Sequence, residues 1–307
     1  MNAAALQLTQ RATCPGCDAA VGRTVYSVPF AEPPLRDYLT EFYGGRLDVD
    51  ALADASYELV DCSSCGLLYQ RSRPDDVSLP AFYASVVEAD RCDVETRRGD
   101  SVRRAAALDV RRTIARCRRP ASDVAILDYG AGTGMWVDCA AAVGTETWVC
   151  ELDPVAADRL AAAGHQVVHP DHLPSERFDF VNAEQVLEHV AEPLRVVERL
   201  ARSLRPGGYL RLSVPNGSGV RALLEHPDWS APKSSATSLN AVAPLEHLNC
   251  FDHNALAGIG QRGGLTLVQF PLRTEFSAAT SVRSIVAALS RRLRPPAGTL
   301  LYFQRRS

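Results

Sequence analysis

The chain has 307 residues, of which 46% are hydrophobic, so it is long enough to bury a sizeable core and we expect two domains. Its formal net charge of −3 and isoelectric point of about 6.2 exclude a global positive field that would attract nucleic acid. The sequence contains no apolar run of membrane-spanning length, no internal repeat and no long low-complexity tract, so we expect no membrane partner.

Two C-x-x-C knuckles stand near the start of the chain, Cys14-Pro-Gly-Cys17 and Cys62-Ser-Ser-Cys65. Each knuckle can present two thiolates to one ion, and four thiolates close a tetrahedral structural zinc site. Disulfides and a redox dithiol are competing interpretations. The five other cysteines are scattered and no signal peptide is evident, which favours a reducing, cytoplasmic compartment over disulfides. A redox dithiol needs a βαβ context that is absent here, so we predict a structural Zn²⁺ bound by these four cysteines.

Aromatic side chains lie on both sides of the second knuckle, where we expect most of them to pack in the core of a small domain. The residues concerned are Tyr38, Phe42, Tyr43, Tyr69, Phe82 and Tyr83. Further along, residues 97–119 are predicted to form a helix, because Val102, Ala106, Val110 and Ile114 recur at steps of four. This pattern favours a linker helix that packs on a sheet over a helix that contacts RNA.

The segment 124–153 indicates a cofactor pocket. An apolar run ends in Asp128 and turns through three glycines, and a second apolar run ends in Glu151. The glycines are Gly130, Gly132 and Gly134. Glycine lets a backbone turn tightly and lie against a ligand, and an acid that closes the second strand accepts hydrogen bonds from ribose hydroxyls. The third glycine comes one position earlier than in the dinucleotide fingerprint, and the Asp128 carboxylate repels pyrophosphate but suits a positively charged ligand.

The segments that follow alternate between helix and strand. Helices are predicted over residues 154–163, 193–204, 252–262 and 278–292. Strands are predicted over residues 166–169, 178–183, 209–214, 265–270 and 300–304. Gly164 closes the first of these helices, and Arg205-Pro-Gly-Gly208 punctuates the end of the second. Residues 216–250 are irregular and polar, and a connection of this length is typical of a functional lid or a disordered segment.

Asp128-Tyr-Gly-Ala-Gly-Thr-Gly134 resembles motif I of the class I S-adenosylmethionine-dependent methyltransferases, and the segments 178–190 and 204–216 resemble regions that follow in the same order. The resemblance covers residues 121–307. It implies an α/β, Rossmann-like fold with a seven-stranded, mostly parallel sheet flanked by helices, in which the last strand inserts antiparallel between the fifth and sixth. It also implies S-adenosylmethionine as the cofactor. The residues expected to hold it are Asp128, Gly130, Gly132, Gly134, Glu151, Asp171 and Glu184.

Residues 58–83 resemble the end of the small N-terminal zinc-binding module that precedes many bacterial methyltransferase domains. Those enzymes commonly modify sugars, nucleotide-linked sugars or secondary metabolites. The resemblance implies a zinc-binding domain over residues 1–90 that can help to wall the acceptor pocket. A linker helix is then expected over 91–120 and the methyltransferase domain over 121–307, with a lid insertion at 216–250.

His189 and His247 are the candidate bases, because both lie in segments that edge the methyl-transfer cleft in this family and histidine titrates near working pH. Glu246 is expected to orient one of them or to contact the acceptor, although His189 can also serve only to hold its loop. The predicted reaction is in-line methyl transfer to a small hydroxylated acceptor with histidine-assisted deprotonation. A zinc-ribbon RNA methyltransferase and a non-catalytic, cofactor-binding regulator are the alternatives. The acceptor, the methylated atom type and the oligomeric state stay open.

Overall fold

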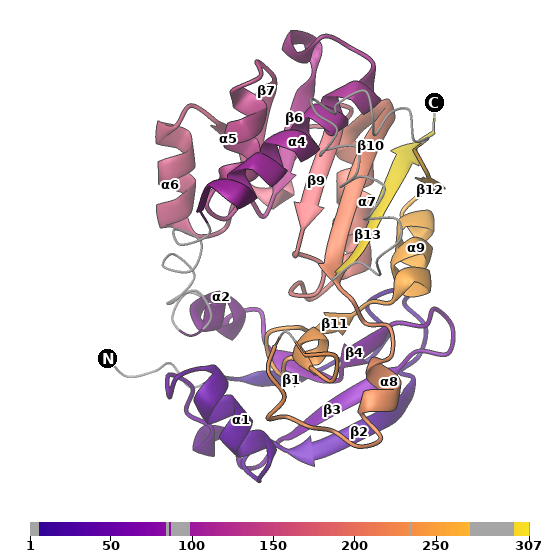
Figure 1. Ribbon diagram of the computed structural model, residues 1–307. Helices are drawn as coiled ribbons and strands as arrows, with labels where there is room; N and C mark the ends of the chain where they lie inside the picture. Colours follow the sequence, from indigo (N-terminus) through magenta and orange to yellow (C-terminus); the bar gives the residue numbers. More distant parts are fainter. Residues whose placement is uncertain (1–5, 84–85, 87–98, 234, 271–297, 307) are drawn as a thin grey trace. The chain divides into compact units, whose positions relative to one another are not determined.

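The computed structural model describes residues 6–83, 86, 99–233, 235–270 and 298–306 (Figure 1). Contacts within the chain define two compact units. The N-terminal unit comprises Met1–Asp93, Leu187–Leu194 and Pro215–Ile259, and the large-sheet unit comprises Val94–Val186, Arg195–Val214 and Gly260–Ser307. The expected domain boundaries at residues 90 and 120 do not describe these units, because two later segments join the N-terminal residues.

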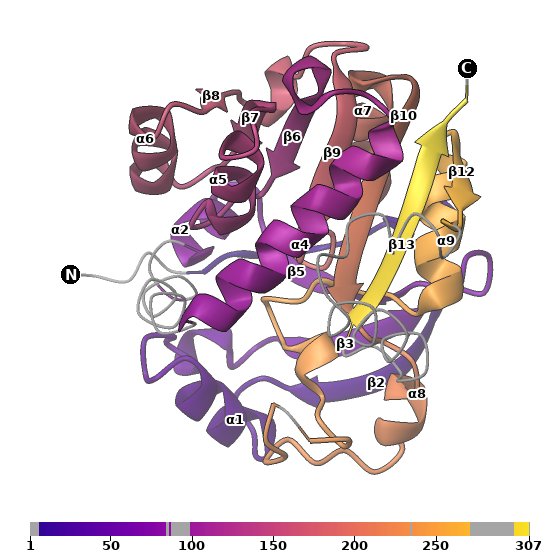
Figure 2. The same ribbon diagram turned by 45° about the horizontal axis from the view of Figure 1, so that its top comes forward.

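Seven strands form the sheet of the large-sheet unit, in the order β12-β13-β10-β9-β6-β7-β8 (Figure 2). The strands are β6 (Ala125–Tyr129), β7 (Glu146–Cys150), β8 (Gln166–Val167), β9 (Phe178–Glu184), β10 (Leu204–Pro215), β12 (Leu265–Val268) and β13 (Gly298–Arg305). Strands β8, β7, β6, β9 and β10 pair in parallel, whereas β13 pairs antiparallel with β12. The predicted fold class is therefore confirmed for this unit, including insertion of the last strand between the fifth and sixth.

Helices border this sheet, and Figure 2 shows α4 lying across one of its faces. The helices of this unit are α4 (Gly99–Cys117), α5 (Met135–Ala141), α6 (Pro154–Ala162) and most of α7 (Pro193–Ser203), with single turns at η4 (Ala121–Asp123) and η5 (Pro170–His172). Helix α9 (His253–Arg262) belongs to the N-terminal unit up to Ile259. Every residue of β6 is buried, which is typical of a central parallel strand covered on both faces. Val110 of α4, Trp136 of α5 and Phe180 of β9 belong to one buried cluster, so the predicted linker helix is part of this core.

The fifth strand begins earlier than its sequence predicts. Strand β10 starts at Leu204, and its pairing with β9 shifts register between Leu204 and Tyr209. Gly207 has a φ of 80°, and a Cβ on Gly208 would lie 2.9 Å from the Phe178 carbonyl oxygen. The Arg-Pro-Gly-Gly segment therefore forms an irregularity within a strand as well as ending a helix. The helix predicted over 278–292 lies outside the described residues.

The N-terminal unit contains a four-stranded antiparallel sheet, β11-β4-β3-β2, and a two-stranded sheet, β1-β5. Its strands are β1 (Leu8–Gln10), β2 (Arg23–Pro29), β3 (Ser56–Asp61), β4 (Leu68–Gln70), β5 (Ser72–Pro74) and β11 (Asn249–Cys250). Its helical segments are α1 (Leu35–Phe42), η1 (Asp50–Leu52), α2 (Ser78–Phe82), α8 (Val220–Leu223) and η6 (Asn240–Val242). None of the helices in the described ranges has the length and apolar character needed to cross a bilayer.

Residues 216–250 are built into the core of this unit and do not form the expected lid. Trp229 and Leu245 are buried in the same cluster as Tyr57. The hydroxyl of Tyr57 donates to the Val242 carbonyl (2.5 Å), and that of Tyr43 donates to the Pro244 carbonyl (2.6 Å). The segment looked irregular because its apolar residues follow no helix or strand period, although several of them are buried in the same cluster as residues of the N-terminal sheet.

Candidate functional site

The loop between β6 and α5 carries the three predicted glycines, all with positive φ: 76° at Gly130, 53° at Gly132 and 81° at Gly134. This conformation strains any residue with a Cβ. A Cβ on Gly130 would lie 2.6 Å from Val186, and one on Gly134 would lie 2.4 Å from Leu160. A Cβ on Gly132 would meet nothing within 4 Å. The outer glycines thus allow close packing, whereas Gly132 leaves open space at the loop.

Glu151 follows β7 directly and turns toward this loop. Its Oε2 accepts a hydrogen bond from the Gly132 amide (2.7 Å), and its Oε1 accepts from the amides of Leu152 (2.7 Å) and Asp153 (3.1 Å). The side chain of Leu152 is largely exposed beside it. The carboxyl edge of β6 and β7 therefore carries the acid Glu151, the open turn at Gly132 and the exposed side chain of Leu152.

Asp128 lies within β6 and is almost completely buried. Its Oδ1 accepts a hydrogen bond from the Asn182 side-chain amide of β9 (2.7 Å). Burial raises the pKa of Asp128 to about 7, because a charged carboxylate is poorly solvated there. The group is therefore in a position to change charge near neutral pH.

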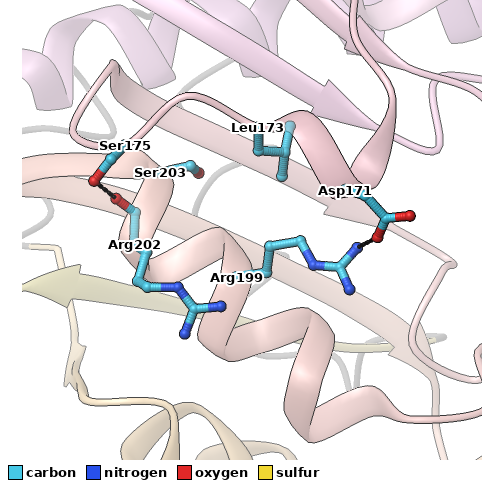
Figure 3. Close-up of a pocket in the computed structure, with 6 residues that line it drawn as sticks. All are labelled: Asp171, Leu173, Ser175, Arg199, Arg202 and Ser203. Carbon is cyan, nitrogen blue, oxygen red and sulfur yellow. Dashed lines mark hydrogen bonds and ion pairs between the residues drawn. The ribbon is translucent and has the colours of Figure 1, made fainter.

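The two other acids predicted for the cofactor have arginine partners. Glu184 ends β9 and pairs with Arg211 of β10 (2.9 Å). Asp171 lies in η5, where it pairs with Arg199 of α7 (2.9 Å) and is mostly exposed. Asp171 and Arg199 line a cavity of about 330 Å³ together with Leu173, Ser175, Arg202 and Ser203 (Figure 3).

The predicted catalytic side chains gather within the N-terminal unit. The rings of His189 and His247 lie 4.9 Å apart. Nδ1 of His247 lies 2.5 Å from the Asn240 carbonyl oxygen, and Nδ1 of His189 lies 3.0 Å from the Glu246 carbonyl oxygen. Nε2 of His247 is 3.9 Å from the Glu246 carboxylate. All three predicted residues are thus brought together, and their side chains are at least 85% buried.

Two further residues complete this group, and the sequence did not assign them a catalytic place. The Tyr83 hydroxyl lies 2.7 Å from Nδ1 of His189 and donates to the Glu246 carbonyl (2.9 Å). Glu188 is 1% exposed, and its carboxylate lies 3.7 Å from Nε2 of His189. Glu188 precedes His189 directly, so an acid next to a candidate base was a usable signal in the sequence. Tyr83 lies 106 positions from His189, and no sequence spacing links the two.

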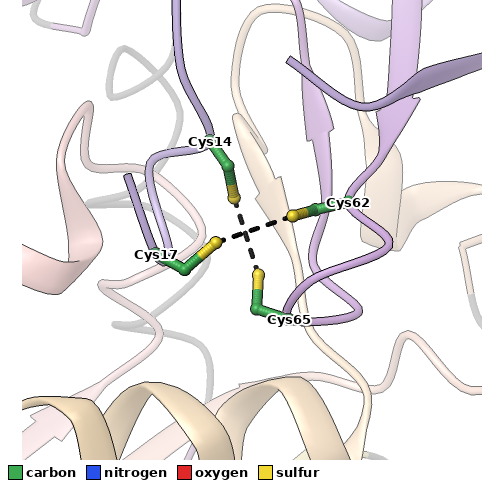
Figure 4. Close-up of side chains that lie close together, drawn as sticks. All are labelled: Cys14, Cys17, Cys62 and Cys65. Carbon is green, nitrogen blue, oxygen red and sulfur yellow. Dashed lines mark hydrogen bonds between the residues drawn. The ribbon is translucent and has the colours of Figure 1, made fainter. Parts of the chain in front are cut away.

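The four knuckle cysteines meet in the N-terminal unit with their sulfurs turned inward (Figure 4). The sulfurs of Cys14 and Cys65 are 3.5 Å apart, and those of Cys17 and Cys62 are 3.6 Å apart. A tetrahedron of zinc–sulfur bonds has sulfurs about 3.8 Å apart, so this donor set fits Zn²⁺ in size and chemistry. None of the eight described cysteines forms a disulfide.

A strand, a glycine turn, a helix and an acid after the next strand define the class of nucleoside-cofactor-binding α/β enzymes. Residues 100–270 match the profile of the family described as a methyltransferase domain, which is more than half of the chain. The chain belongs to this methyltransferase family, and it is an S-adenosylmethionine-dependent methyltransferase.

The chain is similar to curated enzymes named ubiquinone biosynthesis O-methyltransferase. It is 30% identical to that of Xanthomonas oryzae over 180 residues, which cover 53% of this chain and 75% of the relative. It is 29% identical to that of Nitrobacter winogradskyi, covering 53% of this chain and 67% of the relative.

Solved structures with a similar chain include a 1,6-didemethyltoxoflavin-N1-methyltransferase from Burkholderia thailandensis, with 15% identity and a TM-score of 0.49. That alignment covers 82% of this chain and 96% of the other. An S-adenosylmethionine-dependent methyltransferase from Mesorhizobium loti has 19% identity and a TM-score of 0.43, with coverages of 61% and 93%.

Proposed function

We propose that this enzyme methylates a hydroxyl group of a small molecule, such as a sugar, a nucleotide-linked sugar or a secondary metabolite. The observation that carries the proposal is the buried pair His189 and His247 with Glu246 beside it. The O-methyltransferase activity named for the relatives supports a hydroxyl acceptor. The net charge of −3 favours a small molecule over RNA as the partner.

The glycine loop and its neighbouring acids suit the cofactor's ribose and its positively charged methionine part. Open space at Gly132 would receive the ligand against the backbone, and Glu151 would accept hydrogen bonds from the ribose hydroxyls. The buried carboxylate of Asp128 would favour positive charge nearby. When bound, S-adenosylmethionine supplies a methyl group on a sulfonium that is its own leaving group.

We infer that His247 is the base and that His189 positions Tyr83, whose hydroxyl lies 2.7 Å from Nδ1 of His189. A backbone carbonyl only accepts, so Nδ1 of His247 carries the proton donated to Asn240, and Nε2 is then the basic nitrogen. His189 has the Tyr83 hydroxyl and the Glu246 carbonyl at Nδ1 and the Glu188 carboxylate near Nε2. His247 would take the acceptor's hydroxyl proton at Nε2, while His189 would hold Tyr83 and the loop.

For the knuckles we propose a structural Zn²⁺ that joins two distant segments of the N-terminal unit. Cys14 and Cys17 lie between β1 and β2, whereas Cys62 and Cys65 form the turn between β3 and β4. With four thiolate ligands the ion has no open position for a substrate, so its contribution is to folding.

Replacing His247 by glutamine is expected to lower the rate of methyl transfer about 10²- to 10⁴-fold, because the acceptor loses its general base. Radiolabelled S-adenosylmethionine and a panel of catechols, phenols, nucleoside diphosphate sugars and total RNA would measure the activity. The rate of the variant should rise with pH as the hydroxyl ionises by itself. S-adenosylhomocysteine binding, measured by calorimetry, should stay unchanged.

His253→Gln is the matched control, because His253 belongs to the same unit and is exposed. Equal rates for both variants would reject His247 as the base. Methylation of RNA alone would favour the RNA methyltransferase, and tight cofactor binding with no methylated product would favour a regulator.

A further inference from the structure

A chain of polar side chains connects the buried acid of motif I to α4, entirely within the large-sheet unit. Asp128 of β6 accepts from the Asn182 amide of β9 (2.7 Å), and the Asn182 oxygen accepts from Nη1 of Arg211 on β10 (2.5 Å). Nη1 of Arg211 also reaches Glu184 (2.9 Å), and its Nε lies 3.8 Å from Asp109 of α4. Arg211 is 7% exposed, so its guanidinium is buried and not solvated at the protein surface.

We propose that Arg211 is a positioning residue for the cofactor, because it fixes the orientation of the Asn182 amide toward Asp128. An asparagine amide has one accepting and one donating end. With Arg211 at its oxygen, Asn182 must turn its NH₂ group to the carboxylate; the reversed amide would set an oxygen against Asp128. The inference goes beyond the choice of acceptor and depends only on the cofactor pocket.

The guanidinium of Arg211 is held by two acids, Glu184 of β9 and Asp109 of α4. Glu184 and Asp109 supply negative charge to the guanidinium, and the Trp136 indole donates to the Asp109 carboxylate (2.9 Å). Because Asp109 belongs to α4, the helix predicted as a linker also takes part in holding the cofactor pocket. Arginine suits this place because its planar group donates to several acceptors at fixed angles.

The same arrangement controls the charge of Asp128. The charged groups that face Asp128 are Glu151 after β7, Glu184 of β9 and Arg211 of β10. Burial, Glu184 and Glu151 raise the pKa of Asp128, whereas the Asn182 hydrogen bond and Arg211 lower it. Loss of Arg211 or of the amide donor should therefore leave a larger fraction of Asp128 protonated at neutral pH.

The test is the pH dependence of S-adenosylhomocysteine binding by calorimetry, since this ligand keeps the ammonium group of the methionine part. Wild-type binding should tighten as pH rises through about 7, where Asp128 ionises. In Arg211→Met the midpoint should move up by about one pH unit, which weakens binding at pH 7 about fivefold. Asn182→Leu should move the midpoint in the same direction, and the double variant should add little to it.

Arg305→Met is the matched control, because it removes an arginine–glutamate pair with Glu176 in the same unit without touching this chain of contacts or a predicted cofactor residue. Its midpoint should equal that of wild type. If Arg211→Met fails to fold, Arg211→Lys and Asn182→Leu make the same test, with thermal unfolding measured for each. An unchanged midpoint in folded variants, or fully additive shifts in the double variant, would overturn the proposal.

Discussion

Gly132→Val is expected to abolish S-adenosylhomocysteine binding in calorimetry while the protein stays folded. Valine would place its side chain in the open space at the loop, where the ligand must lie against the backbone. The φ of 53° is also strained for a branched residue, which costs about 1–2 kcal/mol. The loss of binding would thus exceed any loss of stability.

Gly144→Val separates these two effects. Gly144 follows α5 in the same unit, has a φ of 90°, and a Cβ there would also meet nothing within 4 Å. This variant should lose a similar amount of stability and keep its affinity. Glu151→Ala should resemble Gly132→Val, because it removes both the ribose acceptor and the partner of the Gly132 amide. Unchanged affinity in Gly132→Val and Glu151→Ala would show that the pocket is wrongly assigned.

The cofactor half of the molecule was predictable because its signals are local. Apolar runs gave the positions of β6, β7 and β9, and the glycine pattern gave the turn between β6 and α5. Asp128 and Glu151 each end such a run, so their places on the sheet follow from the sequence alone. The positive φ of Gly132 agrees with the tight turn that the glycine pattern predicts.

The core of the N-terminal unit and the surroundings of His189 depend on contacts between residues far apart in the chain. Trp229 and Leu245 looked like parts of a polar loop, because no sequence period links them to the sheet they pack on. The contact between Tyr83 and His189 has no local signature either. Asn182 and Arg211 did carry a signal: a polar residue within an apolar strand needs a buried partner.

Cys62→Ser is expected to release the metal and to unfold the N-terminal unit. Wild-type protein purified under reducing conditions should contain about one equivalent of zinc per chain by elemental analysis. Structural zinc contributes about 10–16 kcal/mol of apparent binding free energy in small peptides, and a domain of ordinary stability has about 5–15 kcal/mol. Loss of one thiolate can therefore remove most of the stability of this unit.

The two units should respond differently, which makes the effect measurable. Limited proteolysis of Cys62→Ser should cleave first within residues 6–83, while the strands of the large-sheet unit stay protected. Cys117→Ser is the control, because Cys117 ends α4 in the large-sheet unit and lies outside the knuckles. It should keep its zinc and its protease resistance. Wild-type protein without metal, or equal zinc in both variants, would reject the zinc assignment, because four converging thiols would then be held by side-chain packing alone.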